Sequence, residues 1–405
     1  MGSVTRLLGE ICDEVDGVIR TGPFGSQLHE SDYRPEGVPV VMPKDIIDGK
    51  VSAAAIAKIG EEDVARLVQH KLRKGDIVYG RRGDIGRRAL ITDREMGWLC
   101  GTGCLRISLG ATVLDPAFLY YYLGQPRVIS LISNQAIGAT MPNLNTSIIR
   151  NIPIFYPPLS EQRKIASILS AYDDLIENNN RRIKILEGMA QAIYKEWFVN
   201  FYFPGHKKVK MVKSKLGMIP AGWEVKTLGD VCHILMGQSP KSEFYNTIGD
   251  GLPFHQGVTD FGRRFPTHST YCTVENRIAE KGDILLSVRA PVGRINVANT
   301  KLVIGRGLSA VRHREDLQSY LYYQLKTIFT KEDSMGSGSI FKAVTKEDMH
   351  GIKLLVPNRG LDKSFDVLAM PIDSQVENLS IKNENLRKTR DLLLPKLISG
   401  EIALS

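Results

Sequence analysis

The chain has 405 residues, of which 43% are hydrophobic and 24% charged, an ordinary globular composition that excludes a mainly disordered chain. The net charge of +9 fits a polyanionic partner, but a solvated basic surface gives similar values, so charge alone does not decide between them. Acidic residues interrupt the amino terminus and no run approaches about 18 apolar residues, so we expect a cytoplasmic protein without a signal peptide or membrane span.

Residues 1–157 are predicted to form a mixed α/β domain. Short β-rich runs alternate there with turn residues, and a tyrosine-rich segment at 118–123 predicts a short helix. The β-rich runs are residues 38–41, 75–80, 89–92 and 105–108. Cys100 and Cys104 have the separation of metal ligands, but no second Cys or His pair lies at a matching distance. We therefore expect reduced thiols and no structural metal.

A long amphipathic helix is predicted at 158–200. Once Asn179 is counted, its apolar positions follow alternating spacings of four and three, the heptad pattern of a coiled coil. The seam positions are Ile165, Leu169, Tyr172, Ile176, Asn179, Ile183, Leu186, Ala190, Ile193 and Trp197. A helix of about 40 residues would be about 60 Å long, more than a small domain needs, so we interpret it as a spacer. The alternative is that each long helix packs separately on its own domain.

A basic linker at 201–222 leads into a second mixed α/β domain at 223–357. Residues 205–215 contain several lysines and no acidic residue, which predicts an exposed connector, with contact to phosphates as the alternative. Residues 283–288 and 295–298 are again β-rich, and 320–325 is again tyrosine-rich. The second domain thus repeats the element types of the first.

A second long helix is predicted at 358–405, with a kink or restart near Pro371, because proline removes a helical hydrogen bond. Its seam positions are Phe365, Ala369, Ile372, Val376, Leu379, Asn383, Leu386, Arg390, Leu393 and Leu397. Pro395 also counts against an unbroken helix.

The two helices are predicted to pack antiparallel with Asn179 opposite Asn383. A buried asparagine is costly unless it is paired, and each seam contains one. Paired residue numbers then sum to about 562, which places apolar side chains opposite one another. The exception is Tyr172, which meets Arg390 and for which we expect a stacked guanidinium. The alternative is that one asparagine is solvated at a frayed or kinked stretch near Pro371.

The second half of the chain repeats the first. At an offset of 200 residues, Pro157 matches Pro357, Asp173 matches Asp373, and Leu186 matches Leu386, while upstream the copies correspond only with gaps. A tandem repeat of such large units predicts internal pseudo-two-fold symmetry and a partner that is itself two-fold or linear. DNA fits both descriptions.

The motifs of a self-sufficient DNA enzyme are missing. The glycine-rich stretch 22–26 lacks the Lys-Ser/Thr ending of a phosphate loop and is interpreted as a turn. Pro157 and Pro158 lack the flanking residues of a motif that grips a flipped adenine, so they predict a helix entry. No acidic cluster with a nearby lysine indicates a nuclease. We therefore expect no catalytic residues in this chain.

Several motifs resemble those of specificity subunits of type I restriction-modification enzymes. The first resembles the family's conserved helical region, the second its entry into a second recognition domain, and the third its carboxyl-terminal region. They lie at residues 157–165 with 177–180 and 196–198, at 215–223, and at 392–401. The order matches the family's over the whole chain. Two departures are the absence of the entry motif from the first domain and the atypical stretch 358–363.

The resemblance implies a non-catalytic reader of double-stranded DNA. Each target-recognition domain would read one half of a bipartite site, and the long helices, as an antiparallel coiled coil, would set the spacer between the halves. Such subunits scaffold two adenine methyltransferase subunits, and ATP-driven translocating endonuclease subunits join the full complex. S-adenosylmethionine, ATP and magnesium would be bound by these partners, so we expect no cofactor in this chain.

Candidate DNA-binding residues are polar side chains in predicted loops, because arginine can bind the edge of guanine and asparagine or glutamine that of adenine. They are Arg81, Arg82, Arg87, Arg88, Thr140 and Asn143 in the first domain, and Gln256, Arg263, Arg264, Arg289, Arg294, Ser339 and Lys342 in the second. Most protein–DNA hydrogen bonds reach the backbone, so phosphate contact is the alternative for each. The sequence does not identify the recognised bases.

Two other functions remain open at this point. The chain could be a scaffold that grips nucleic acid without sequence preference, or a self-contained DNA methyltransferase or nuclease with unrecognised motifs. Competition with random duplex DNA distinguishes the first from a specificity subunit. Activity of the purified chain alone would support the second.

Overall fold

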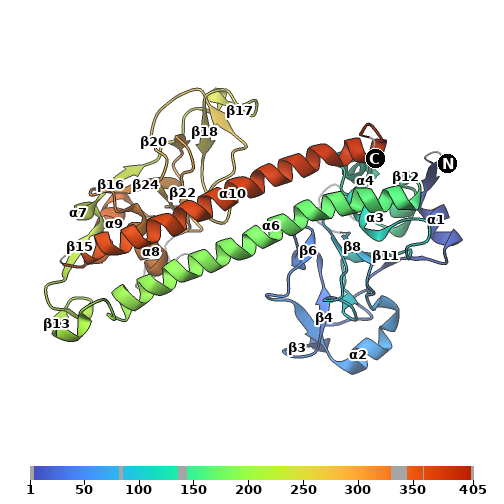
Figure 1. Ribbon diagram of the computed structural model, residues 1–405, viewed down its shortest axis with the longest axis horizontal. Coiled ribbons are helices and arrows are strands. Elements are labelled where there is room, and N and C mark those ends of the chain that lie inside the picture. Colours follow the sequence, from blue (N-terminus) through green and yellow to red (C-terminus); the bar gives the residue numbers. More distant parts are fainter. Residues whose placement is uncertain (1–3, 82–84, 136–143, 330–343, 359, 403–405) are drawn as a thin grey trace. The chain divides into compact units, whose positions relative to one another are not determined.

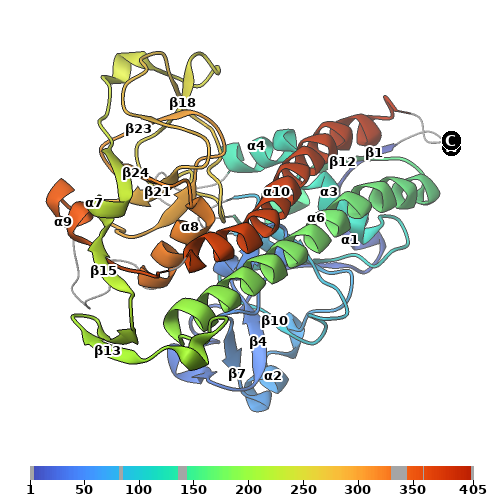
Figure 2. The same ribbon diagram turned by 60° about the vertical axis from the view of Figure 1, so that its left-hand side comes forward.

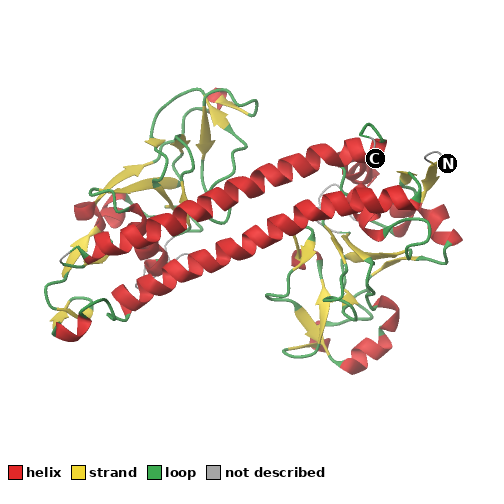
Figure 3. Cartoon of the chain, in the orientation of Figure 1, coloured by secondary structure: helices red, strands yellow, loops and turns green. Residues whose placement is uncertain are grey.

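The computed structural model describes residues 4–81, 85–135, 144–329, 344–358 and 360–402 (Figure 1). The chain divides into two compact units, which we call unit 1 (Met1–Asn179 with Lys382–Ser405) and unit 2 (Asn180–Ile381). Figure 3 shows that strands and helices occur together in both units, as expected for a mixed α/β protein. Across the described ranges, none of the helices combines the length and hydropathy needed to cross a membrane.

Unit 1 alternates short strands and short helices along the chain. They are β1 (Val4–Leu7), α1 (Leu8–Glu14), β2 (Val18–Thr21), η1 (Glu30–Asp32), β3 (Tyr33–Arg34), β4 (Val38–Val41), η2 (Pro43–Asp45), β5 (Ile46–Ile47), β6 (Lys50–Val51), β7 (Ala57–Ile59), α2 (Glu61–Arg66), η3 (Val68–His70), β8 (Ile77–Gly80), β9 (Arg88–Leu90), β10 (Leu99–Cys100), β11 (Cys104–Ser108), α3 (Pro116–Tyr122), α4 (Pro126–Gln135), α5 (Thr146–Arg150) and β12 (Pro153–Tyr156). The predicted β-rich runs correspond to β4, β8, β9 and β11, and the tyrosine-rich segment corresponds to α3.

Unit 2 repeats this alternation. Its elements are η5 (His206–Lys208), β13 (Met211–Ser214), β14 (Gly217–Pro220), β15 (Glu224–Thr227), α7 (Leu228–Val231), β16 (Cys232–Met236), η6 (Ser242–Phe244), β17 (Tyr245–Asn246), β18 (Leu252–His255), β19 (Tyr271–Cys272), β20 (Ile278–Ala279), β21 (Ile284–Ser287), β22 (Ile295–Val297), β23 (Leu302–Ile304), β24 (Leu308–His313), α8 (Gln318–Ile328), α9 (Lys346–Gly351) and β25 (Lys353–Val356). The basic linker contains the hairpin β13–β14, whose lysines are exposed as predicted.

The two long helices are α6 (Leu159–Tyr194), followed by the π-helical turn η4 (Lys195–Val199), and α10 (Leu361–Ser399). Helix α6 begins directly after Pro157 and Pro158, the helix entry that the sequence predicts. Each helix contributes to both units, because the units divide α6 after Asn179 and α10 after Ile381.

Each unit has a four-stranded antiparallel sheet with the same topology. The order is β2-β11-β8-β9 in unit 1 and β16-β24-β21-β22 in unit 2. A second sheet in each unit contains a parallel pair, β4 with β10 and β18 with β23. Antiparallel pairing of β1 with β12 and of β15 with β25 joins the first and last strands of each domain. The repeat seen in the sequence is therefore a repeat of the fold.

The core of each unit contains residues from both long helices. The end of α10 packs with the start of α6 in unit 1, and the end of α6 packs with the start of α10 in unit 2. In unit 1, Leu394, Leu397 and Ile398 of α10 are buried in the same cluster as Ile165 and Leu169 of α6. In unit 2, the end of α6 and the start of α10 share a cluster with α8, which lies beside α10 (Figure 2). Burial of these apolar faces fixes the helices on the sheets.

The predicted register of the helix seam is observed. In unit 1, Asn179 Nδ2 donates to Asn383 Oδ1 at 2.9 Å. In unit 2, the Trp197 and Phe365 rings are 6.3 Å apart in an edge-on arrangement, and Ile183 lies in one buried cluster with neighbours from both helices. The pairs on either side of the asparagines therefore follow the same antiparallel register.

Two expectations about the helices were wrong. Helix α10 continues through Pro371 and Pro395 without a restart. Both prolines are exposed, so water can satisfy the carbonyl groups that lose their helical partners, while packing on the opposite face holds the helix. Arg390 pairs with the carboxylates of Asp173 and Asp391 rather than stacking on Tyr172. An ion pair of low exposure is stronger than a cation–π contact with a half-buried ring.

Candidate nucleic-acid interface

The loops at one end of the four-stranded sheet converge in each unit. Because the strands are antiparallel, β2 and β8 end where β11 and β9 begin, and β16 and β21 end where β24 and β22 begin. We call these connections the sheet-end loops. Their described residues are 22–27, 81, 85–87 and 101–103 in unit 1, and 237–241, 288–294 and 305–307 in unit 2.

Backbone hydrogen bonds place the sheet-end loops identically in the two units. Arg81 N donates to Gly103 O at 2.8 Å, and Val288 N donates to Gly307 O at 2.9 Å. Arg81 O in turn accepts from Leu144 N, and Val288 O accepts from Val344 N, both at 2.9 Å. Leu144 and Val344 therefore lie at the same end of the sheet as Arg81 and Val288, respectively.

Glycines allow these loops to approach one another closely. A Cβ atom at Gly22 would lie 2.0 Å from the carbonyl oxygen of Gly101. At Gly237 it would lie 2.2 Å from the carbonyl oxygen of Gly305. Any side chain at either position would push the loops apart, so glycine is required at both.

The predicted residues of unit 1 differ in their surroundings. Arg87 is exposed, and its carbonyl accepts from Gly80 N at 2.8 Å. Arg88 is half-buried, donates from Nε to Tyr120 O at 2.7 Å and lies over the Tyr120 ring, so it supports α3. Arg81 is buried, and its Nε donates to Leu144 O at 3.1 Å. Three predicted residues lie outside the described ranges, namely Arg82, Thr140 and Asn143.

In unit 2, Arg289 and Arg294 are exposed on the sheet-end loop between β21 and β22. Arg294 is the counterpart of Arg87, because its carbonyl accepts from Ser287 N as that of Arg87 accepts from Gly80 N. Gln256 is exposed and accepts from Ser239 Oγ at 2.7 Å. Exposed Arg263 binds Glu187 Oε2 at 3.0 Å. The remaining predicted residues, Ser339 and Lys342, lie outside the described ranges.

Arg264 is unsuited to DNA contact in this structure. It is 5% exposed, and its guanidinium binds Asp373 Oδ1 at 2.7 Å and lies 4.1 Å from the centre of the Tyr322 ring. Breaking a buried ion pair to reach DNA would leave Asp373 uncompensated. Arg264, a candidate because it is a polar residue of a predicted loop, is therefore removed from the candidate set.

An aspartate and a tyrosine connect each recognition domain to its long helix. Tyr121 Oη donates to Asp173 Oδ2 at 2.6 Å, and Tyr323 Oη donates to Asp373 Oδ1 at 2.8 Å. Burial, followed by the nearby carboxylate, raises the pKa of both tyrosines, so both remain donors. The arginine that pairs with the aspartate comes from a different element in each unit. It is Arg390 of α10 in unit 1 and Arg264 of the recognition domain in unit 2.

Sequence reasoning missed three residues of the sheet-end loops. Phe24 is 54% exposed although its side chain is entirely apolar, Ser239 binds Gln256, and Arg306 is exposed between two glycines. Phe24 could have been identified from its place in a glycine-rich turn directly after a strand. Matching Gly22 with Gly237 would then have identified Ser239 as its counterpart.

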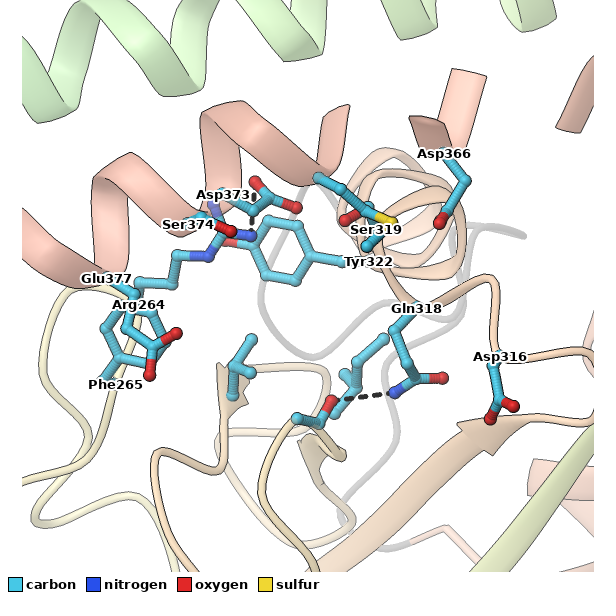
Figure 4. Close-up of a pocket in the computed structure, with 14 residues that line it drawn as sticks. Arg264, Phe265, Asp316, Gln318, Ser319, Tyr322, Asp366, Asp373, Ser374 and Glu377 are labelled. Atoms are coloured by element: carbon cyan, nitrogen blue, oxygen red, sulfur yellow. Dashed lines mark hydrogen bonds and ion pairs between the residues drawn. The ribbon is translucent and has the colours of Figure 1, made fainter. Parts of the chain in front are cut away.

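A cavity of about 300 Å³ lies in unit 2 between α8, α10 and the sheet (Figure 4). Gly282, Ile284 and Val297 line it, and these residues lie at the end of β21 and β22 that is opposite to the sheet-end loops. Two of its carboxylates already have cationic partners, Asp373 with Arg264 and Glu377 with Lys281. Within the described ranges, no group of three or more His, Cys, Asp or Glu side chains could hold a metal ion. We therefore place the candidate interface at the sheet-end loops.

Comparison with known proteins identifies the family of this chain. The model of the type I restriction modification DNA specificity domain matches residues 8–187 and 220–364. The putative type I restriction enzyme MjaX specificity subunit of Methanocaldococcus jannaschii is 32% identical over 95% of this chain and 91% of its own length. The HindI specificity subunit of Haemophilus influenzae is 23% identical over 88% of this chain and 93% of its own.

A solved structure has a similar fold. The crystal structure of the type I restriction-modification system S subunit from M. genitalium covers 98% of this chain and 96% of its own at a TM-score of 0.58 and 18% identity. The family model matches well over half of the chain, in one segment for each domain, and the first segment also covers α6 as far as residue 187. The chain thus belongs to the family of type I restriction-modification DNA specificity subunits, and it is the specificity subunit rather than a catalytic subunit of such an enzyme.

Proposed function

We propose that this chain reads a bipartite DNA site, with one half-site recognised by each domain through its sheet-end loops. The division into domains at 1–157 and 223–357, long helices at 158–200 and 358–405, and a linker at 201–222 belongs to this proposal. The observation that supports it is the repeated geometry, in which equivalent backbone hydrogen bonds join the described residues of the sheet-end loops in both units. Two similar reading edges suit two half-sites on one linear duplex.

The exposed arginines of these loops supply the chemistry that DNA requires. Arg87, Arg289 and Arg294 are exposed, and Arg306 adds a fourth exposed guanidinium to the set. A guanidinium binds phosphate oxygens without sequence preference, and binds the O6 and N7 atoms of guanine when it enters the major groove. The loops can therefore position the chain on the duplex and read bases in the same complex.

Two adenine methyltransferase subunits would bind one chain through the helical regions and the surfaces beside them. The repeated fold supports this stoichiometry, since two equivalent surfaces on one chain recruit two identical partners. ATP-dependent translocating endonuclease subunits would join the full complex. S-adenosylmethionine, ATP and magnesium would then be bound by these partner subunits.

Selection from a random duplex library by the chain with its cognate methyltransferase tests this function. A specificity subunit enriches one split motif by orders of magnitude over random DNA, whereas a nonspecific scaffold enriches none. Native mass spectrometry of the coexpressed complex should show two methyltransferases per chain, and a one-to-one limit under excess partner would contradict the proposed stoichiometry. Methylation by the chain alone would support a self-contained enzyme instead.

A further inference from the structure

We propose that the two domains read different base chemistry, because equivalent positions of their sheet ends are apolar in unit 1 and hydrogen-bonding in unit 2. Phe24 and Met42 would contact the methyl group of a thymine, whereas Ser239 and Gln256 would bind the edge of an adenine. This inference rests on the proposed function and names the residues that make the two half-sites different.

The first equivalent pair is Phe24 and Ser239. Gly22 N donates to Cys104 O and Gly237 N donates to Leu308 O, each at 2.9 Å, so the two glycines occupy the same position at the end of the first sheet strand. Phe24 and Ser239 each lie two residues beyond that glycine. The same backbone position thus presents an aromatic ring in one unit and a hydroxyl group in the other.

The second equivalent pair is Met42 and Gln256, which follow the parallel strands β4 and β18. A Cβ atom at Gly101 would lie 2.7 Å from Met42 Sδ, and one at Gly305 would lie 2.7 Å from Gln256 Oε1. The neighbouring backbone agrees, since Gly101 N donates to Val41 O at 2.9 Å and Gly305 N to His255 O at 2.8 Å. Both side chains therefore lie over the equivalent glycine of their sheet end.

In unit 1, hydrogen bonds hold the backbone of the turn that carries the exposed Phe24 ring. Gln27 N donates to Phe24 O at 2.8 Å, and Thr102 Oγ1 donates to Pro23 O at 2.9 Å. The Arg81 guanidinium lies 5.7 Å from the centre of the ring. An ordered, exposed phenylalanine is available for apolar contact, and the methyl group of thymine is the apolar feature of the major groove.

In unit 2, hydrogen bonds hold the Gln256 amide. Its Oε1 accepts from Ser239 Oγ at 2.7 Å, and Ser239 Oγ accepts from Arg306 N at 3.2 Å. The amide oxygen has a second lone pair and Nε2 has two hydrogens. These groups match the N6 donor and N7 acceptor of adenine, so the geometry pre-orders a glutamine for bidentate readout.

Deoxyuridine substitution tests the unit 1 half of the inference, because it removes only the methyl group of thymine. The probes are duplexes carrying the motif selected by the wild-type complex, with one thymine of the first half-site replaced at a time. At one position, deoxyuridine should weaken wild-type binding several-fold, whereas Phe24→Ala should bind thymine and deoxyuridine equally. Val68→Ala is the matched control, since Val68 is an exposed apolar residue of unit 1 outside the sheet-end loops.

Gln256→Met and Gln256→Glu test the unit 2 half. Gln256→Met should lose about 10-fold to 100-fold discrimination at one A·T pair. Gln256→Glu should change the preferred base at that position from adenine to cytosine, whose N4 group donates to a carboxylate. The first half-site should be read as in the wild type, which also shows that the variant is folded.

The outcomes separate this inference from the function on which it rests. Equal loss of affinity on every probe, or no change at any single base, would overturn the assignment of these residues. A wild-type motif without a thymine in its first half-site would do the same. If the wild-type complex selects no bipartite motif, the proposed function fails and the inference fails with it.

Discussion

Asn179 of α6 and Asn383 of α10 form an amide-to-amide hydrogen bond of 2.9 Å within unit 1. Asn383 is 2% exposed, so its amide would be unsatisfied in any register that moved it away from a polar partner. A shift along the seam would also move apolar side chains of both helices out of contact. The pair therefore specifies one antiparallel register among several that the apolar residues alone would permit.

Replacing one asparagine of this pair should destabilise the protein more than replacing both. Asn179→Leu removes the hydrogen bond that Asn179 donates to the buried Asn383 amide oxygen, and we expect a loss of about 1 to 3 kcal/mol in the free energy of unfolding. Asn179→Leu with Asn383→Leu should recover part of this loss, because two apolar side chains then meet in the seam. Urea unfolding of four proteins, the wild type, Asn179→Leu, Asn383→Leu and the double variant, measures the difference. Additive losses would show that the two amides do not act as a pair.

The adjacent residues Arg263 and Arg264 should contribute very differently to stability. Arg264→Leu leaves the Asp373 carboxylate without its buried partner, so we expect a loss of about 3 to 5 kcal/mol. Arg263→Leu is the matched comparison. Its side chain is 49% exposed and remains partly solvated, but its partner Glu187 is only 9% exposed, so we expect a loss that is smaller than that of Arg264→Leu but not negligible. Urea unfolding followed by tryptophan fluorescence compares them. Equal losses would refute a structural role specific to Arg264.

Stability should fall as the pH is lowered from 6.5 toward 4. Burial, followed by the charges of Arg20 and Arg106, lowers the pKa of His70 to about 4, and burial, followed by His268, lowers that of His255 to about 4. In this window the unfolded chain binds protons that the folded chain does not, so the free energy of unfolding decreases. Each histidine contributes a slope of up to about 1.4 kcal/mol per pH unit.

The measurement is urea unfolding at pH 7.5, 6.5, 5.5 and 5.0, and above 6.5 these histidines should have no effect. His70→Gln should flatten the pH dependence of unit 1, and His255→Gln that of unit 2. Exposed His29 is the control, and His29→Gln should leave the curve unchanged. A wild-type curve that is flat between pH 6.5 and 5.0 would contradict the shifts.

Periodic features of the fold could be predicted from the sequence, because the backbone itself sets their period. The seam of α6 and α10 follows from heptad spacing, and its register follows from the cost of an unpaired buried amide. The β-rich runs could be located because branched and aromatic residues there alternate with turn residues. Such signals are local, apart from the pairing of Asn179 with Asn383, which could be predicted because each seam contains one asparagine.

Contacts between distant residues outside the seam could not be predicted. Arg390 sits in the seam, but its partner Asp173 lies beside the seam, and the heptad pattern pairs only seam residues with one another. Arg264 is a DNA-binding candidate in the sequence, because its burial depends on the carboxylate of Asp373, which is more than 100 residues away along the chain. The exposure of Phe24 could not be predicted either, since it depends on a turn and on the close approach of Gly22 to Gly101, which forms only in the folded sheet.

Arg87→Ala and Arg294→Ala should impair different halves of the DNA site. The two residues occupy equivalent positions, so their removal is a matched comparison between the domains. On probes with one half-site scrambled at a time, each variant should lose about 1 to 3 kcal/mol of discrimination at its own half-site, if it contacts a base there. Arg88→Ala is less informative, because it also removes the support of α3. Equal weakening on every probe would assign both arginines to phosphate contact.

Lengthening both long helices together should lengthen the preferred DNA spacer. The two units divide α6 after Asn179 and α10 just before Asn383, so residues inserted there fall between the paired seams of unit 1 and unit 2. Seven residues after Asn179, with seven before Asn383, add one heptad to each helix and leave every existing seam pair intact. At 1.5 Å per residue, each helix gains about 10 Å, which corresponds to about three base pairs of duplex.

The expected outcome is a selected motif with unchanged half-sites and a spacer longer by about three base pairs. Seven residues inserted in the exposed hairpin loop between β13 and β14 are the control and should leave the spacer as it is, because no seam pair changes. Insertion in α6 alone offsets the two seams by one heptad, so it should reduce binding to every motif. If the matched insertion leaves the wild-type spacer preferred, the helices do not measure the site, and the distance between half-sites must be set by the bound methyltransferase subunits.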